Sequence, residues 1–222
     1  MIPGLIDCAA HAPGVDAELF VVEGLSAAEA VIAVRNPSFQ AVMPIQGKPL
    51  NALRASPGRL QSNSWFASLT DALGAAAGCA LPLGELRYGR VLLLLDPDAD
   101  GIHIGALLQM FFYRCMRALF ERGQIEIVHA PWGEVRSASG APFLAYHEHE
   151  FQQLCRRESK IAGTRVERIR HRGLGSITPS LLERTCINPR TRTSRVLTIG
   201  DAEAAIAVFG GERSPREWAN RA

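Results

Sequence analysis

The sequence predicts an α/β fold: a mostly parallel sheet flanked by helices, followed by a helical basic C-terminal tail. Short apolar segments with strand character alternate with longer segments of helical character. Residues 91–95 are apolar throughout, which is typical of a strand buried on both faces of a parallel sheet. With 222 residues, 47% of them hydrophobic, the chain is long enough to bury a sizeable core.

Each element follows from the local pattern. Strands are expected near residues 18–22, 39–43, 90–95 and 124–128. Helices are expected near residues 26–34, 64–78, 101–121, 148–158, 178–186, 201–208 and 214–220. This alternation implies right-handed crossovers between parallel strands. The stretch 46–63 is rich in proline and polar residues, so it is expected to be a long loop.

Three carboxylates follow the most apolar strand. Asp96, Asp98 and Asp100 occupy alternating positions where the chain leaves the sheet. Ligands usually bind at the carboxyl ends of strands in an open α/β sheet. Carboxylates this close to one another repel unless a cation joins them. Oxygen ligands without Cys or His suit Mg²⁺, so the sequence predicts a magnesium site, which Mn²⁺ could also occupy.

Two other interpretations of this acidic turn compete with a metal site. An EF-hand loop shares the first six positions, but it needs a bidentate Glu at position twelve, where this chain has Leu107. The EF-hand is therefore rejected. A solvated acidic turn that caps the helix beginning near Gly101 remains an alternative, because acidic residues at a helix N-terminus are common.

A second strand delivers a carboxylate to the same edge. Residues 18–22 are a short strand that ends at Glu23 and Gly24, before a helix-like run. Two parallel strands that end in carboxylates could together hold one or two Mg²⁺ ions with open positions for phosphate oxygens. That arrangement is the one needed for phosphodiester transfer.

The acidic motifs carry a family resemblance. Glu23-Gly24 followed by Asp96-x-Asp98-x-Asp100 resembles the Toprim domain of topoisomerases, primases and some nucleases. The resemblance narrows to the B subunits of bacterial type IIA topoisomerases, gyrase and topoisomerase IV. Further segments that share it are residues 2–8, 39–51, 86–88, 111–114, 121–123, 172–175 and 188–192. One family carboxylate is replaced here by Leu25.

The resemblance implies a division of the chain and a set of site residues. It implies a Rossmann-like Toprim domain over residues 1–133 and an extension over residues 134–222 that resembles the gyrase B tail. The metal ligands would be Glu23, Asp96 and Asp98, with Asp100 in support. The catalytic residues implied are Glu23, Asp96, Asp98 and Lys48.

The implied function is that of a DNA topoisomerase component, a module for DNA cleavage and rejoining that is not a complete enzyme alone. A partner would supply the ATPase and the nucleophilic tyrosine, the latter from a topoisomerase A-type subunit, because Tyr88, Tyr113 and Tyr146 carry no mark of activation. No phosphate-binding loop of the P-loop type is present, so no ATP binding is expected. Two alternatives remain: a diverged stand-alone protein that binds DNA or gyrase, and a Toprim nuclease that uses water.

Charge is unevenly distributed. Residues 1–150 have a net charge of −5 and residues 151–222 a net charge of +7. If the densest basic run forms a strand, Arg168, Arg170 and Arg172 share one face and could contact DNA phosphates. An ordinary solvated face is the alternative. Lys48 is one of only two lysines in a chain with 22 arginines. The resemblance places it near the metal, where its ammonium could contact DNA. A structural role in the loop is the alternative.

The remaining composition points to the cytoplasm. The five cysteines are scattered without a Cys-x-x-Cys pair, which is typical of reduced thiols. No apolar run is long enough to span a membrane, and no signal peptide is recognisable at the start. A cytoplasmic protein without membrane contact is therefore expected.

Overall fold

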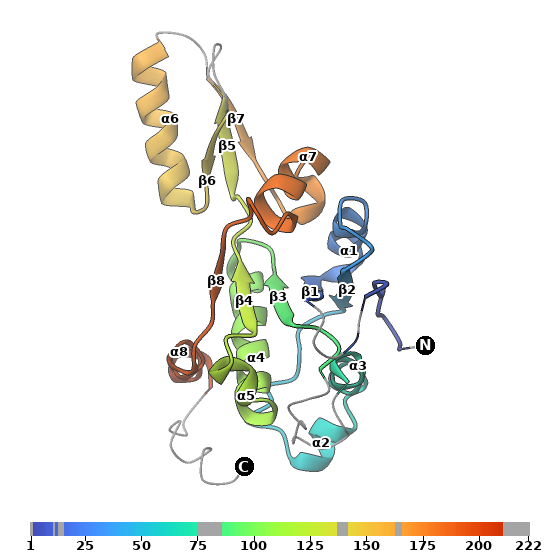
Figure 1. Ribbon diagram of the computed structural model, residues 1–222. Helices are drawn as coiled ribbons and strands as arrows, with labels where there is room; N and C mark the ends of the chain where they lie inside the picture. Colours follow the sequence, from blue (N-terminus) through green and yellow to red (C-terminus); the bar gives the residue numbers. More distant parts are fainter. Residues whose placement is uncertain are drawn as a thin grey trace.

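The computed structural model describes residues 2–10, 12, 16–74, 86–136, 142–162 and 166–210 (Figure 1). Two expected features fall outside these ranges. They are the helix near residues 214–220 and the end of the helix near residues 64–78.

The main sheet has five strands in the order β2-β1-β3-β4-β8. Its strands are β1 (Glu18–Glu23), β2 (Gln40–Ile45), β3 (Arg90–Leu94), β4 (Ile125–Val128) and β8 (Ser194–Val196). The first four are parallel, which confirms the predicted sheet. The fifth strand, β8, was not expected, and it pairs antiparallel with β4.

The helices are α1 (Gly24–Ile32), α2 (Pro57–Gln61), α3 (Ser64–Leu73), α4 (Ala99–Cys115), α5 (Ala118–Glu121), α6 (Glu148–Ala162), α7 (Pro179–Leu182) and α8 (Ile199–Phe209). A 3₁₀ turn, η1 (Leu174–Ser176), precedes α7, and a π-helical turn, η2 (Glu183–Ile187), follows it.

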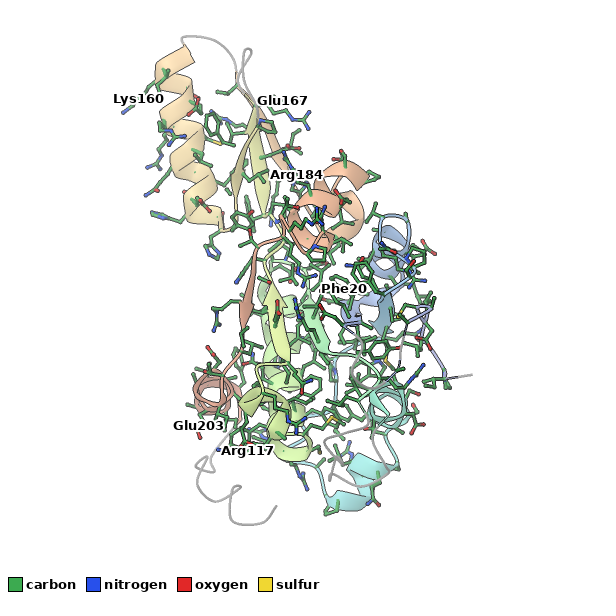
Figure 2. All side chains as sticks on the ribbon, in the orientation of Figure 1. Phe20, Arg117, Lys160, Glu167, Arg184 and Glu203 are labelled. Carbon is green, nitrogen blue, oxygen red and sulfur yellow. The ribbon has the colours of Figure 1, made fainter. Side chains whose placement is uncertain are left out.

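The sheet separates two hydrophobic cores because successive side chains of a strand point to opposite faces. Val21 and Leu93 face one core, which is completed by α3, α4, α5 and α8. Phe20 and Leu92 face the other core, which is completed by α1 and α7. Figure 2 shows Phe20 at this second face, close to α1. Burial of strand residues on both faces is the reason that residues 91–95 are apolar throughout.

A small lobe extends beyond the carboxyl end of β4 (Figure 1). It is an antiparallel sheet in the order β6-β5-β7, made of β5 (Gly133–Arg136), β6 (Phe143–Ala145) and β7 (Glu167–Arg170), with α6 packed on it. Lys160 and Glu167 mark its far end in Figure 2. This sheet was not expected, since the tail was predicted to be helical. Strand β5 crosses the expected boundary between residues 133 and 134.

Three element boundaries differ from the predictions. The helix expected over 101–121 is two helices, because α4 ends at Cys115 and Met116 leaves helical geometry with φ −145°. The expected loop 46–63 contains α2, which Ser56 caps and which has Pro57 at its first position. The helix expected over 178–186 begins as α7 and continues as the π-helical turn.

Within the described residues, no helix combines the length and the apolar composition needed to span a bilayer.

Candidate metal centre

Glu23 and Asp96 leave the sheet side by side. Glu23 is the last residue of β1, and Asp96 lies two residues beyond the end of β3. The two strands are neighbours, with Val22 paired to Leu94. The structure therefore brings both carboxylates to one edge of the sheet, where the sequence placed them. Gly24 follows Glu23 with φ +78°, which allows the chain to turn directly into α1.

The turn between β3 and α4 is built around Asp98 and Gly101. Asp98 is the N-cap of α4, and its Oδ1 accepts a hydrogen bond from the Gly101 N–H at 2.9 Å. A Cβ atom on Gly101 would lie 2.0 Å from the carbonyl oxygen of Asp96, so only glycine fits. Asp100 occupies the first turn of α4. The helix-capping role that the sequence left open is therefore filled by Oδ1 of Asp98.

The C-terminal tail positions Asp96. The backbone N–H of Leu174 donates to Asp96 Oδ1 at 2.9 Å. Gly173, with φ +155°, lies so close that a Cβ atom there would be 2.8 Å from Asp96 Oδ2. Sequence reasoning missed this contact. The only available signal was the Gly173-Leu174-Gly175 motif, which the tail resemblance alone singles out.

The edge of the sheet that carries Glu23 and the three aspartates favours the binding of a cation. Burial raises the pKa of Glu23, and the charges of Asp96, Asp98 and Asp100 raise it further. Burial also raises the pKa of Asp96, although the hydrogen bond from Leu174 opposes this. Glu23 Oε2 is buried and has no hydrogen-bond partner among the described residues. An unsatisfied buried acceptor is costly, so a cation at this edge would relieve both the desolvation and the repulsion.

Lys48 lies at the same edge. Its Nζ is 2.7 Å from Asp100 Oδ1, and both side chains are more than half exposed. The hydrogen bond from this ammonium holds the pKa of Asp100 below its ordinary value. An ion pair this exposed contributes little to stability, so Lys48 is available to other anions. His103, one turn along α4, stacks on Phe209 with ring centroids 5.3 Å apart.

The carboxylates share an edge without forming a closed cage. Among the described residues, no three His, Cys, Asp or Glu side chains are grouped closely enough to hold an ion by themselves. Mg²⁺ is typically bound by one or two carboxylates together with water and substrate phosphates, so a cage of protein ligands is not required. The donor chemistry and the unpartnered oxygen of Glu23 therefore fit Mg²⁺.

The basic run lies on the small lobe. Arg168 and Arg170 belong to β7, and Arg172 follows the strand. The Arg170 guanidinium lies over the Trp132 ring, 4.7 Å from its centroid, and Arg168 Nη2 donates to Ser159 Oγ at 3.3 Å. All three arginines are exposed. Arg168 and Arg170 lie on the small lobe, whereas Arg172 directly precedes Gly173, which contacts Asp96.

Two of the tyrosines are structural. The hydroxyl of Tyr88 donates to Asp7 Oδ1 at 2.6 Å, and that of Tyr113 to Glu203 Oε1 at 3.3 Å. Both rings are buried, and burial raises the pKa of Tyr88. A phenol that resists ionisation is a poor nucleophile. Tyr146 lines a cavity beside Asp96.

Comparison with known proteins agrees with this architecture. The Toprim domain matches residues 18–130. The B subunit of DNA gyrase from Thermotoga maritima is 40% identical over 192 residues, covering 86% of this chain and 30% of that protein. The B subunit of DNA gyrase from Thermus thermophilus is 35% identical over 224 residues, covering 97% of this chain and 34% of that protein.

A third relative, the B subunit of DNA gyrase from Archaeoglobus fulgidus, is 34% identical over 209 residues, covering 94% of this chain and 32% of that protein. The chain thus spans about a third of the length of the curated relatives it matches. The Toprim match includes β1, β3 and both strand-terminal carboxylates. The chain therefore belongs to the Toprim domain family, and most of its length is similar to one part of DNA gyrase B subunits.

Proposed function

We propose that this chain is a magnesium-dependent Toprim module of a type IIA DNA topoisomerase, acting in DNA cleavage and rejoining. One observation carries the proposal. Glu23 ends a strand beside Asp96, its Oε2 is buried without a partner among the described residues, and burial together with the charges of three aspartates raises its pKa. The similarity to gyrase B subunits gives the class of reaction.

Each residue at the edge has a distinct part in this function. Glu23 and Asp96 would hold the metal, with Asp98 as a further ligand and Asp100 in support. Bound Mg²⁺ stabilises negative charge on the attacking and leaving oxygens of a phosphodiester. The exposed pair between Lys48 and Asp100 can open at little cost, and the ammonium would then contact a DNA phosphate.

The proposed module depends on partners. Tyr88 and Tyr113 are buried, so the nucleophilic tyrosine would come from a topoisomerase A-type subunit. The ATPase would likewise come from a partner, since this chain corresponds to only about a third of the length of its relatives. DNA is the proposed substrate, contacted by Lys48 and by the arginines of the small lobe.

A second candidate function rests on the surface beside the carboxylates. Leu25 is 58% exposed and Ile102 is 63% exposed. Leu25 follows the Glu23-Gly24 turn, and Ile102 lies in the first turn of α4. Exposed apolar side chains at this edge favour a protein contact over a phosphate contact. They support the part of the alternative in which a diverged protein binds gyrase without cleaving DNA.

Metal binding is tested by titration calorimetry with Mn²⁺. Asp98→Asn should weaken binding, because asparagine keeps the N-cap hydrogen bond but removes the charge. The matched control is Asp71→Asn, which alters an exposed carboxylate on α3 and should leave binding unchanged. Equal Mn²⁺ affinity for the wild type and Asp98→Asn would contradict the proposed ligand set.

A plasmid assay separates the functions. Supercoiled plasmid, Mg²⁺ and this chain are incubated with and without the A-type subunit of a gyrase, and the reaction is stopped with denaturant. DNA linked covalently to the A-type subunit only when both proteins are present supports the topoisomerase module. Nicking by this chain alone supports the nuclease. Binding without cleavage in every mixture supports the second candidate.

A further inference from the structure

An open cavity of about 360 Å³ lies on the small lobe, between α6 and β7. Its lining consists of Phe151, Gln152, Cys155, Arg156, Ser159 and Arg168. The first five of these residues belong to α6, and Arg168 belongs to β7. Cavities that bind small organic molecules measure roughly 300–1,000 Å³, so this one is large enough for a small ligand. None of the carboxylates of the candidate metal centre lines it.

One stripe of α6 supplies the apolar part of the lining. Phe151, Cys155 and Ser159 recur every fourth residue, so they lie on the same side of the helix. The Phe151 ring packs on Trp132 with ring centroids 5.2 Å apart, and a Cβ atom on Gly133 would lie 2.9 Å from the same ring. The Phe151 ring is therefore held against the start of β5, and this side of the cavity is rigid.

Arg156 and Arg168 bring two positive charges to the cavity. Both side chains are exposed, and among the described residues neither forms an ion pair with a carboxylate. Arg168 Nη2 donates to Ser159 Oγ at 3.3 Å. The hydroxyl of Ser159 is a neutral partner, so the charge of Arg168 is not compensated.

The carboxylates of α6 and β7 have partners elsewhere. The pairs are Glu148 with Gln152, Glu150 with the N–H of Tyr146, Glu158 with Arg157, and Glu167 with Arg136. No Asp or Glu lines the cavity. Two arginines without a counter-charge therefore face a lining that contains no carboxylate.

This lining selects an anion that has an apolar part. Guanidinium groups bind carboxylates and phosphates through paired N–H groups. An exposed ion pair contributes little by itself, so burial of the apolar surface of Phe151 and Cys155 must add to the affinity. A bare phosphate would leave that surface in contact with water. A neutral apolar ligand would leave both arginines without a counter-charge.

We propose that this cavity binds an organic anion with an apolar body. Arg156 and Arg168 hold its carboxylate, and Phe151 and Cys155 contact its apolar part. A free carboxylic acid has this chemistry, and so does the carboxyl terminus of a polypeptide that ends in an apolar residue. Binding at this cavity requires neither the metal nor DNA cleavage, so the inference goes beyond the proposed function and is independent of it.

The test is an NMR titration of the ¹⁵N-labelled protein with N-acetylphenylalanine and with its neutral amide, N-acetylphenylalaninamide. The two probes have the same apolar body and differ in the carboxylate. The acid should shift backbone signals of α6 and β7 with a Kd on the order of 1 mM. The amide should bind about threefold to fivefold more weakly, because it cannot pair with the arginines.

Arg156→Gln and Arg168→Gln should each reduce the preference for the acid, because each removes one positive charge from the lining. The matched control is Arg184→Gln, which makes the same change at an exposed position of η2 that does not line the cavity. This variant should retain the preference. The comparison of acid with amide uses the unaltered protein, so it tests the proposal even if a variant fails to fold.

Two further probes identify the source of the ligand. Tighter binding of acetyl-Gly-Gly-Phe than of 3-phenylpropanoate identifies a polypeptide terminus, whereas equal or weaker binding of the peptide identifies a free acid. Equal affinity for the acid and the amide overturns the proposal, and so do shifts confined to residues outside the small lobe. If inorganic phosphate binds at the same signals as tightly as N-acetylphenylalanine does, the apolar surface contributes nothing and the proposal is wrong. Mn²⁺ titration tests the metal centre separately, so either result leaves the other standing.

Discussion

Arg192 and Glu18 form a buried bidentate ion pair between residues 174 positions apart in the sequence. Arg192 Nη1 donates to Glu18 Oε2 at 2.7 Å and Nη2 donates to Oε1 at 2.6 Å, and both side chains are 3% exposed. Gln40 Nε2 donates to the same carboxylate at 2.8 Å and to the carbonyl of Ile187 at 3.0 Å. The tail is thus attached to the first two strands of the main sheet.

Arg192→Met should destabilise the protein strongly, because it leaves Glu18 buried without its main cation. Loss of one partner of a buried pair costs about 3–5 kcal/mol. A loss at the lower end of this range is expected, because Arg90 Nη1 lies 3.9 Å from Glu18 Oε1 and partly compensates the charge of Glu18. Urea unfolding measures the change. The control is Arg195→Met, which breaks an exposed pair with Asp201 and should cost less than about 1 kcal/mol. Similar losses in both variants would contradict the prediction.

Gly173→Ala should weaken Mn²⁺ binding by about tenfold or more, because a new Cβ atom would displace Asp96, and groups that orient metal ligands contribute on that scale. The φ of +155° at Gly173 adds backbone strain. The control is Gly175→Ala, whose Cβ atom would meet no atom closer than 3.6 Å. Calorimetric titration of both variants measures the effect. An unchanged affinity in Gly173→Ala would show that the tail does not position the carboxylate.

His171 should make stability depend on pH. It is 4% exposed, and burial lowers its pKa below the ordinary value of 6.5, although the charge of Glu134 and a backbone hydrogen bond with Ser176 oppose the shift. The folded protein binds the proton less tightly than the unfolded chain does. The stabilisation is complete above pH 6.5 and is lost as the pH falls from there toward the lowered folded pKa.

His171→Leu should flatten the pH dependence below pH 6.5, whereas His149→Leu, at an exposed position on α6, should leave it unchanged. Thermal unfolding across this range measures both. If the steep dependence persists without His171, another group is responsible for it.

DNA binding, if it uses the small lobe, should be independent of sequence and steeply weakened by salt. Contact with about three to five phosphates gives a log–log slope of roughly −3 to −4.5. Replacing Arg168, Arg170 and Arg172 with alanine should reduce that slope by up to about three units while preserving Mn²⁺ binding. Arg59→Ala, at an exposed position of α2 on the main body, is the control. An unchanged slope in the triple variant would identify the run as an ordinary solvated face.

The sequence predicted the central strands because their burial on both faces requires continuous apolar residues. The meeting of Glu23 with Asp96 was predictable for the same reason, since parallel strands end at one edge. Strands β5, β7 and β8 were not predictable. They have three or four residues each, and the charged side chains of Glu134, Arg168 and Arg195 interrupt any apolar alternation.

Contacts between residues that are far apart along the chain could not be predicted from the sequence either. Leu174 donates to a carboxylate 78 positions away through its backbone, and every residue type except proline has that N–H group. The cavity beside Asp96 depends on a segment between β6 and α6 that returns to the end of β4. Neither feature leaves a pattern in residue type or spacing.

The small lobe is an insertion with both of its ends attached to the main body. The chain enters it from β4 and leaves it from β7, and β8 later returns to pair with β4 (Figure 1). Only a few residues separate the end of β7 from Leu174, whose N–H group contacts Asp96. A displacement of the lobe would therefore be expected to shift the Leu174 N–H group that orients Asp96, so whatever binds the lobe could change the geometry of the carboxylate edge.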